Sequence, residues 1–201
     1  MKKIVCLLIG VLVLLANVAG SIEIGPTESL KPVLNGLTEV LADESLKGDE
    51  HLLERRKKIM ESISRGFHFR EMSKRVLGKT WRKIDEQQRD YFTELMTKLL
   101  ENVYIGKLEG YSGQAVKYKA EKIKGKRAQV TTCFDHRDVE IPVHYIMKKV
   151  DNKWMVYDIN IEGVSLIRNY NQQFKSILRK EQFDGLVKIL EEKNKSFLNE
   201  Q

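Results

Sequence analysis

The spacing of apolar residues changes in the middle of this 201-residue chain and changes back before its end. Up to Gly113, apolar residues recur every three or four positions, which is typical of amphipathic helices. From Val116 to Ile161 they alternate with polar residues, which is typical of strands that bury one face. The helical spacing returns at Val164. This order predicts an α+β fold, in which helices come first and a sheet and two further helices follow.

The individual elements follow from the same spacing. Helices are expected at residues 26–42, 51–63, 67–78, 85–111, 164–178 and 182–193. Asp85 is the predicted N-cap of the longest helix, because acids and glutamines fill the next turn. Four alternating runs are expected to be strands, at residues 116–120, 128–134, 139–147 and 155–161, the last with Met155, Tyr157, Ile159 and Ile161 on one side. Since the links between the runs are short and turn-rich, we predict a four-stranded, mainly antiparallel sheet covered by helices.

The N-terminus has the layout of a secretory signal peptide. Lys2 and Lys3 precede a mostly apolar run from Ile4 to Leu15, and small residues follow that run. The run is short for a membrane span, and an uncleaved anchor is the alternative interpretation. We therefore predict a signal peptide at residues 1–20 and a single exported domain at residues 21–201.

Export affects how the charge and the cysteines are interpreted. The formal charge is +7 for the whole chain, and it falls to +5 when the two lysines of the signal peptide are removed. In an exported protein, a basic surface favours anionic membranes or acidic proteins over nucleic acid, although it also aids solubility. The lysine-rich segment 118–127 is either a solvated hairpin or a basic docking surface. Cleavage removes Cys6 and leaves Cys133 without an intramolecular disulfide partner.

The segment from Gly163 to Ile167 resembles a hydrolase nucleophile elbow, with Ser165 in the place of the nucleophile. The elbow motif needs a second glycine, and isoleucine occupies that position here. Ser165 is therefore predicted to lie in the first turn of a helix. An exported hydrolase that uses Ser165 or His144 remains an alternative, although no catalytic triad can be assembled from the sequence.

Two other patterns fall short of known ligand sites. Residues 73–80 approach a phosphate-binding loop, but Ser73 replaces its first glycine, and Gly78 is predicted to end a helix instead. The histidines lack the spacing of metal ligands. A cluster in one predicted hairpin turn is either a turn signal or a weak metal site, and it consists of Asp135, His136 and Asp138.

What remains is a large amount of apolar surface. The predicted sheet has one apolar face, the long helix is apolar on more than one side, and Val164, Ile167, Phe174 and Leu178 form a stripe that Asn171 interrupts. Spacing alone leaves two interpretations open. The surface is either an ordinary solid core, as in an exported protein–protein interaction module without a ligand, or the wall of an apolar pocket.

Residues 154–178, "WMVYDINIEGVSLIRNYNQQFKSIL", resemble the signature of the MlaC, or toluene-tolerance, family of periplasmic phospholipid-binding proteins. The resemblance continues through residues 67–104, 111–118 and 185–190, in order along the chain. Two positions depart from the family pattern. The family commonly has arginine where this chain has Asn171, and aspartate where it has His68. The missing arginine leaves open which polar contact it replaces.

The resemblance implies an apolar pocket for phospholipid acyl chains and no catalytic residue, metal or cofactor other than the lipid cargo. It also implies a periplasmic carrier that supports outer-membrane lipid asymmetry as an auxiliary component of an ABC transporter. The implied partners are an outer-membrane lipoprotein complex, an inner-membrane ABC transporter complex and, transiently, the membrane itself. The residues expected to bind lipid are Leu95, Leu99, Val103, Tyr104, Val143, Tyr145, Tyr157, Ile159, Ile161, Val164 and Ile167.

Overall fold

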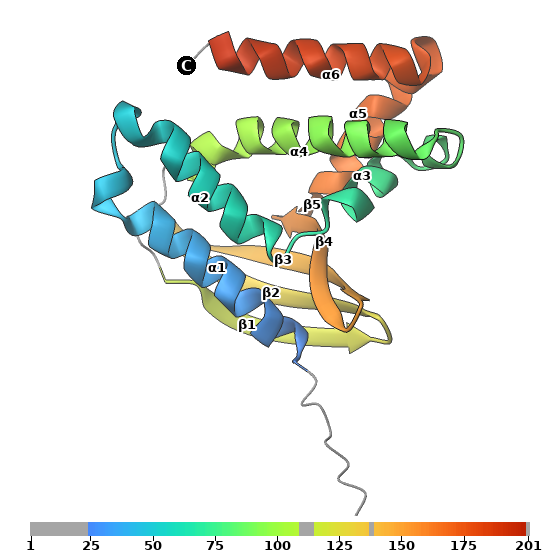
Figure 1. The fold of residues 1–201 in the computed structure, drawn as a ribbon. Helices are drawn as coiled ribbons and strands as arrows, with labels where there is room; N and C mark the ends of the chain where they lie inside the picture. The colour runs from blue at the N-terminus through green and yellow to red at the C-terminus, as the bar shows by residue number, and fades with distance from the viewer. Residues whose placement is uncertain (1–23, 109–114, 137–138, 200–201) are drawn as a thin grey trace, which may run out of the picture.

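The computed structural model describes residues 24–108, 115–136 and 139–199 and shows helices packed on an antiparallel sheet (Figure 1). The α-helices are α1 (Pro26–Ala42), α2 (Leu52–Ser64), α3 (Phe69–Leu77), α4 (Glu86–Leu108), α5 (Leu166–Lys180) and α6 (Gln182–Asn199). Short 3-10 helices are η1 (Glu44–Leu46), η2 (Asp49–His51) and η3 (Thr80–Arg82). The strands are β1 (Lys117–Lys124), β2 (Arg127–His136), β3 (Val139–Val150), β4 (Lys153–Ile161) and β5 (Val164–Ser165). The predicted α+β class is therefore correct.

The sheet has five strands in the order β1-β2-β3-β4-β5, and each neighbouring pair is antiparallel. The prediction of four strands was wrong because residues 164–165, which were assigned to a helix, pair with Asn160 and Ile161 first. Glu162 and Gly163 make the turn between them with φ angles of 51° and 84°. Two residues are too short a run for alternation to reveal, so the sequence contains no signal for β5.

A β-bulge in β4 changes which side chains share a face of the sheet. Ile146 pairs with Asp158 and Met147 pairs with Val156, so Tyr157 is the extra residue. Cross-strand partners point to the same side, and the bulge therefore puts Val156 on the same face as Ile159. The predicted grouping of Met155 with Ile159 was wrong, because an inserted residue shifts the alternation by one position.

The main core forms where α1 lies against the sheet, with the other helices beyond it (Figure 1). Its most buried members include Leu30 of α1, Val130, Met147 and Val156 of the sheet, and Phe92 of α4. In Figure 1, α4 and α6 run alongside each other, and α5 connects α6 back to the edge of the sheet. The α-helices thus place an apolar layer over one face of the sheet.

The edge of β4 is covered by the segment that precedes α3. The His68 N–H donates to the Val156 carbonyl (2.8 Å), and the Val156 N–H donates to the Gly66 carbonyl (2.7 Å). A Cβ on Gly66 would lie 2.5 Å from a methyl group of Val33, so glycine allows this segment to approach α1 closely. The backbone groups of β4 are therefore satisfied on both sides at this position.

Local capping signals agree with the predicted helix ends. Asp85 and Gln88 form a capping box, in which the Gln88 N–H donates to Asp85 Oδ1 (2.8 Å) and the Asp85 N–H donates to Gln88 Oε1 (3.1 Å). Gly78 ends α3 with a φ angle of 56°, as predicted for a helix C-terminus. Both predictions are confirmed, because caps depend on a few neighbouring residues and not on the tertiary fold.

Candidate functional site

The residues expected to bind lipid divide into three groups according to their solvent exposure. Leu99, Val143, Tyr157 and Ile167 are buried. A second group packs against the core but is only partly buried, and it comprises Leu95, Val103, Tyr104, Tyr145 and Ile159. The third group lies at the end of the β4–β5 hairpin, where Ile161 is 40% exposed and Val164 is 60% exposed.

Strand register brings four of these residues together on one face. Tyr145 pairs with Ile159, and Val143 pairs with Ile161, so the two pairs are adjacent along β3 and β4. Val143 is 5% exposed and its partner Ile161 is 40% exposed, so the apolar layer ends on the β4 side of this pair. We name these four residues the β3–β4 patch.

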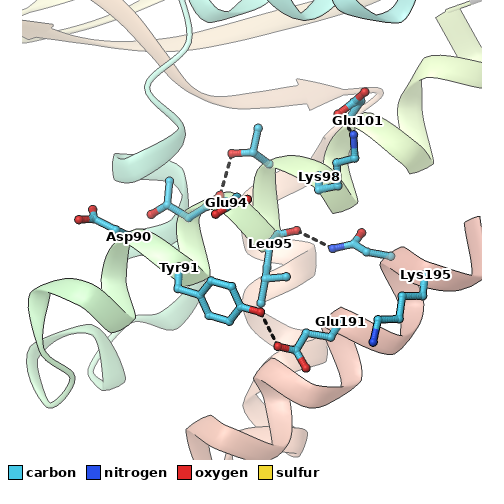
Figure 2. Close-up of a pocket in the computed structure, with 11 residues that line it drawn as sticks. Asp90, Tyr91, Glu94, Leu95, Lys98, Glu101, Glu191 and Lys195 are labelled. Carbon is cyan, nitrogen blue, oxygen red and sulfur yellow. Dashed lines mark hydrogen bonds and ion pairs between the residues drawn. The ribbon is translucent and has the colours of Figure 1, made fainter. Parts of the chain in front are cut away.

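Two of the expected residues lie apart from the patch. The Arg75 guanidinium lies 3.9 Å from the centre of the Tyr157 ring, so Tyr157 supports α3 at the bulge. Leu95 lines a groove of about 710 Å³ between α4 and α6, shown in Figure 2. In that groove Tyr91 donates to Glu191, and the Asn194 amide donates to the Leu95 carbonyl. Most of the residues that line this groove are polar or charged.

Tyrosine hydroxyls form a polar margin within the apolar layer. Tyr104 of α4 is hydrogen-bonded to Tyr170 of α5, and Tyr145 of β3 is hydrogen-bonded to Thr132 of β2. Burial raises the pKa of Tyr145 and of Tyr170, so both phenols stay protonated. The prediction did not include Tyr118, Thr132 or Tyr170, because only the strand register and the Tyr104–Tyr170 hydrogen bond bring them near the predicted residues.

Ser165 is the N-cap of α5. Its Oγ accepts from the Arg168 N–H (3.1 Å) and donates to Asp158 Oδ2 (2.6 Å), while Asp158 Oδ1 accepts from the Ile167 N–H (3.0 Å). His144 is hydrogen-bonded to Thr131 (2.9 Å), at a different place on the sheet. The Ser165 hydroxyl therefore caps α5 and is held in place by Asp158. The helix was predicted to begin at residue 164, whereas α5 begins at Leu166, so Ser165 precedes its first turn.

Replacing Ser165 by alanine is expected to lower stability by about 1 kcal/mol, because α5 loses its N-cap. The lipid content of the purified protein should not change. Thermal melting and lipid extraction of the same sample measure both effects. Ser176→Ala is a matched control, since that hydroxyl donates only to the Gln173 carbonyl within α5. A Ser165→Ala variant that loses a measurable esterase activity would contradict the N-cap assignment.

The two departures from the family pattern both have capping roles. Asn171 Nδ2 donates to the Val76 carbonyl (2.8 Å) and the Arg75 carbonyl (3.3 Å), which are near the end of α3. The His68 Nδ1 accepts from the Glu71 N–H (3.2 Å) at the start of α3. Asn171 therefore fixes α5 against α3, and the polar contact left open by the sequence is one within the protein.

Glu71 joins α3 to the sheet. Its carboxylate accepts from Arg75 Nε (3.0 Å) and from Lys148 Nζ (3.3 Å), although the residue is only 8% exposed. Burial alone would raise the pKa of Glu71, but the Lys148 hydrogen bond and the charge of Arg75 hold it below its ordinary value. This carboxylate therefore stays ionised and fixes α3 beside β3.

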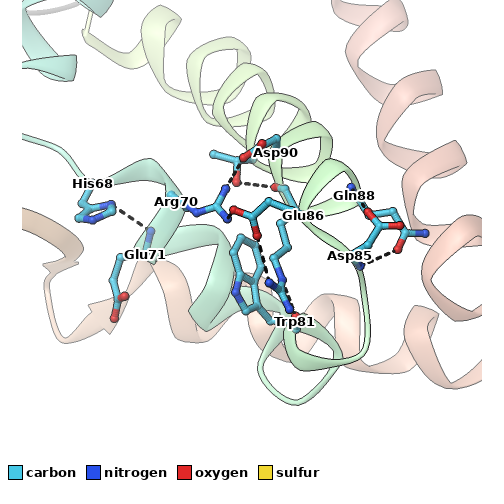
Figure 3. Close-up of polar contacts among 10 residues, drawn as sticks. His68, Arg70, Glu71, Trp81, Asp85, Glu86, Gln88 and Asp90 are labelled. Atoms are coloured by element: carbon cyan, nitrogen blue, oxygen red, sulfur yellow. Dashed lines mark hydrogen bonds and ion pairs between the residues drawn. The ribbon is translucent and has the colours of Figure 1, made fainter.

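A second polar cluster fixes the junction between α3 and α4, as Figure 3 shows. Arg70 pairs with Glu86 and Asp90, and its guanidinium lies 5.3 Å from the centre of the Trp81 ring. Arg89 lies 5.7 Å from the same ring and donates to the Trp81 carbonyl (3.0 Å). These contacts orient α4, which supplies one wall of the apolar layer.

The predicted basic surface is partly neutralised. Lys117 and Lys119 lie 3.4 and 2.9 Å from Glu140 Oε1. Between the other lysines, Ile123 is 55% exposed. The other lysines of this basic surface are Lys122, Lys124 and Lys126. Within the described ranges, no carboxylate lies at ion-pair distance from any of the three.

Several predictions concern residues or side chains that the structure does not describe. The signal peptide at residues 1–20 lies outside the described residues, and so do the side chains of the Asp135–Asp138 turn. Within the described ranges, no three His, Cys, Asp or Glu side chains are grouped so that they could hold a metal ion. No helix in the same part of the chain is both long enough and apolar enough to span a membrane. Cys133 is buried as a free thiol.

The fold is shared with a ligand-carrying α+β protein of known structure. It resembles a phospholipid-binding protein from Ralstonia solanacearum, solved in complex with a phospholipid. The TM-score is 0.79 and the identity is 24%, over 86% of this chain and 98% of that one. A model of the MlaC protein family matches residues 31–192. The chain therefore belongs to the MlaC family.

A relative with a described role is the intermembrane phospholipid transport system binding protein MlaC of Haemophilus influenzae. The two sequences are 27% identical over 119 residues. The match covers 56% of this chain and 56% of the relative, so the chain spans about half the length of the curated relative that it matches.

Proposed function

We propose that this protein is a non-enzymatic phospholipid carrier of the periplasm. Membership of the MlaC family over residues 31–192 is the observation that carries the proposal. The fold supports it, because the Ralstonia protein with the same architecture was solved with a phospholipid. The role of Ser165 as an N-cap also supports a function without covalent chemistry.

The acyl chains are proposed to lie between the β3–β4 patch and the helices α4 and α5. Val103 and Tyr104 of α4 and Ile167 of α5 join the patch in this assignment. We also include Leu99 of α4, which is buried and is proposed to support the residues that contact the acyl chains. Since these side chains contact the core in the structure, the sheet and the helices must move apart to admit lipid.

Transfer of lipid by such a carrier needs no chemistry of its own. Each buried CH₂ group is worth about 0.8 kcal/mol relative to water, so two chains with about 30 carbons represent roughly 20 kcal/mol or more. The lipid comes from a bilayer, however, and a carrier that nearly matches the bilayer exchanges lipid at little net cost. Direction therefore has to come from partners.

We propose that these partners are an outer-membrane lipoprotein complex and an inner-membrane ABC transporter complex. The name of the Haemophilus relative, which refers to intermembrane phospholipid transport, supports this assignment. In this role the protein would shuttle phospholipid between the two membranes and support outer-membrane lipid asymmetry. Export would begin with cleavage of residues 1–20, and N-terminal sequencing of the native protein tests that step.

Organic extraction of the purified protein, followed by mass spectrometry, tests the carrier function. Phospholipid in near-stoichiometric amount is the expected result. Delipidated protein should also recover lipid when it is incubated with vesicles. A protein that yields no lipid and cannot be reloaded would instead be an interaction module with a solid core.

Charge at the β1–β2 hairpin is expected to favour transient contact with anionic membranes. Replacing Lys122, Lys124 and Lys126 by glutamine should weaken binding to vesicles that contain phosphatidylglycerol, by about 1 kcal/mol for each lysine near the surface. Binding of the wild type should also weaken as salt is raised, because exposed charges are screened within about 8 Å at physiological ionic strength.

The matched control removes the same charge from α6, through glutamine at Lys188, Lys193 and Lys195. Co-sedimentation with vesicles measures both variants. Equal losses in the two variants would show that net charge, and not the hairpin, determines membrane contact.

A further inference from the structure

The inner face of the sheet carries a cluster of hydroxyl groups among apolar side chains. Tyr118 of β1 pairs with Thr132 of β2, so the two side chains point to the same side. Tyr145 of β3 is hydrogen-bonded to Thr132, and Tyr118 lies close enough to contribute to the raised pKa of Tyr145. Three neighbouring strands therefore gather their hydroxyls beside the β3–β4 patch, to which Tyr145 belongs. We name Tyr118, Thr132 and Tyr145 the hydroxyl cluster.

Hydrogen-bond accounting leaves one member of the cluster without a partner. Thr132, which is 2% exposed, and Tyr145 have each other as a hydrogen-bond partner. The Tyr118 hydroxyl oxygen is inaccessible to solvent and has no hydrogen-bond partner in the part of the chain that the structure describes. A buried hydroxyl without a partner is unfavourable, so native proteins rarely keep one without a reason. Such a group is available to a ligand that brings an acceptor.

The surroundings of Tyr118 determine which acceptor fits. Burial raises the pKa of Tyr118, and the charge of Glu28 raises it further, so the phenol remains a neutral donor. The cation against its ring is Lys31, whose Nζ lies 5.7 Å from the ring centre and is already paired with Glu28. A phosphate buried there would lack a free counter-charge, whereas a neutral carbonyl oxygen needs only the donor.

We propose that the Tyr118 hydroxyl donates a hydrogen bond to an ester carbonyl of the bound glycerophospholipid. The hydroxyl cluster then lies at the junction between the glycerol unit and the acyl chains, and it selects ester-linked over ether-linked lipid. This inference rests on the proposed function, since it assumes that acyl chains enter the layer beside the β3–β4 patch.

Competition between two lipids that differ only at the carbonyl tests the proposal. Delipidated protein is incubated with vesicles that contain equal amounts of a diacyl and a dialkyl-ether phosphatidylglycerol of the same chain length. Lipid is then extracted from the repurified protein, and the ratio is measured by mass spectrometry. The wild type should enrich the diacyl lipid about fivefold, which corresponds to a net hydrogen bond of about 1 kcal/mol.

Tyr118→Phe should take up both lipids with a ratio near one. Tyr91→Phe is the matched control, because its hydroxyl donates to Glu191 in the distant α4–α6 groove, and it should keep the wild-type ratio. A wild type that does not discriminate, or a Tyr118→Phe variant that still enriches the diacyl lipid, would overturn the proposal. A wild type that takes up neither lipid would overturn the proposed function, and this inference with it.

Melting of the empty proteins gives a second readout that is independent of lipid. Tyr118→Phe removes a hydroxyl without a partner, so its Tm should equal or exceed that of the wild type. Tyr145→Phe breaks the bond with Thr132, and its Tm should fall. An equal fall in both variants would show that the Tyr118 hydroxyl already has a protein partner, which contradicts the proposal.

Discussion

Tryptophan at position 159 is expected to leave the empty protein folded and to remove most of its lipid capacity. Ile159 lies opposite Tyr145 on the inner face, where it packs against the core while remaining partly exposed. In a solid core the larger side chain would overpack and cost about 1–3 kcal/mol. At the wall of a lipid site, the indole instead fills space that an acyl chain needs, so uptake is lost and the fold is kept.

Melting and lipid extraction have to be measured together, on empty and on reloaded protein. Bound lipid stabilises the folded state by mass action, so the wild type must also be melted empty. Leu53→Trp is the matched control, because its side chain is 78% exposed on α2 and is not among the residues expected to bind lipid, and it should change neither quantity. If Ile159→Trp melts far below the wild type when empty and still loads normally, the residue belongs to a solid core.

Glutamine at position 71 is expected to lower the free energy of unfolding by about 2 kcal/mol at pH 7, since hydrogen bonds to a charged group are lost. The wild-type contribution is present above the ordinary Glu pKa of 4.5, because the folded-state pKa of Glu71 is lowered. It is lost as the pH falls through that lowered pKa. The difference between wild type and Glu71→Gln should therefore be constant near neutrality and shrink below pH 4.5.

Urea unfolding at a series of pH values measures this difference. Glu44→Gln is the control, because Glu44 pairs with Lys47 while its side chain is 80% exposed, and such pairs contribute little. A difference for Glu71→Gln that does not shrink in acid would show that its effect comes from packing and not from the ionised carboxylate.

The sequence predicted the elements well where the signal is local. The Asp85 cap depends on Gln88 three residues away, and the end of α3 at Gly78 depends on glycine itself. The bulge at Tyr157 could not be predicted, because its neighbours Val156 and Met155 are both apolar and either register gives an apolar face. The prediction of which β4 side chains share a face of the sheet was therefore wrong on one side of the bulge.

The apolar residues of the candidate site could be predicted from the sequence. Which of them lie next to each other across the strands could not. Tyr145 and Ile159 could be selected from alternation, and the register then places them opposite each other. Tyr118 was missed because its importance depends on two facts outside its own segment, which are its pairing with Thr132 and the lack of a hydrogen-bond acceptor among the described residues. Both facts are properties of the folded sheet.

Strand β1 forms one edge of the sheet, whereas the edge of β4 is covered by β5 and by the segment before α3. An open edge offers unpaired backbone groups to any other strand, including the same strand of a second molecule. In β1, a bulge after Tyr118 interrupts the regular ladder, and Lys122 and Lys124 have no carboxylate at ion-pair distance among the described residues. Two such edges would bring these like charges close together, which destabilises their pairing. The charge of β1 therefore helps to keep separate copies from joining edge to edge into larger aggregates at high protein concentration.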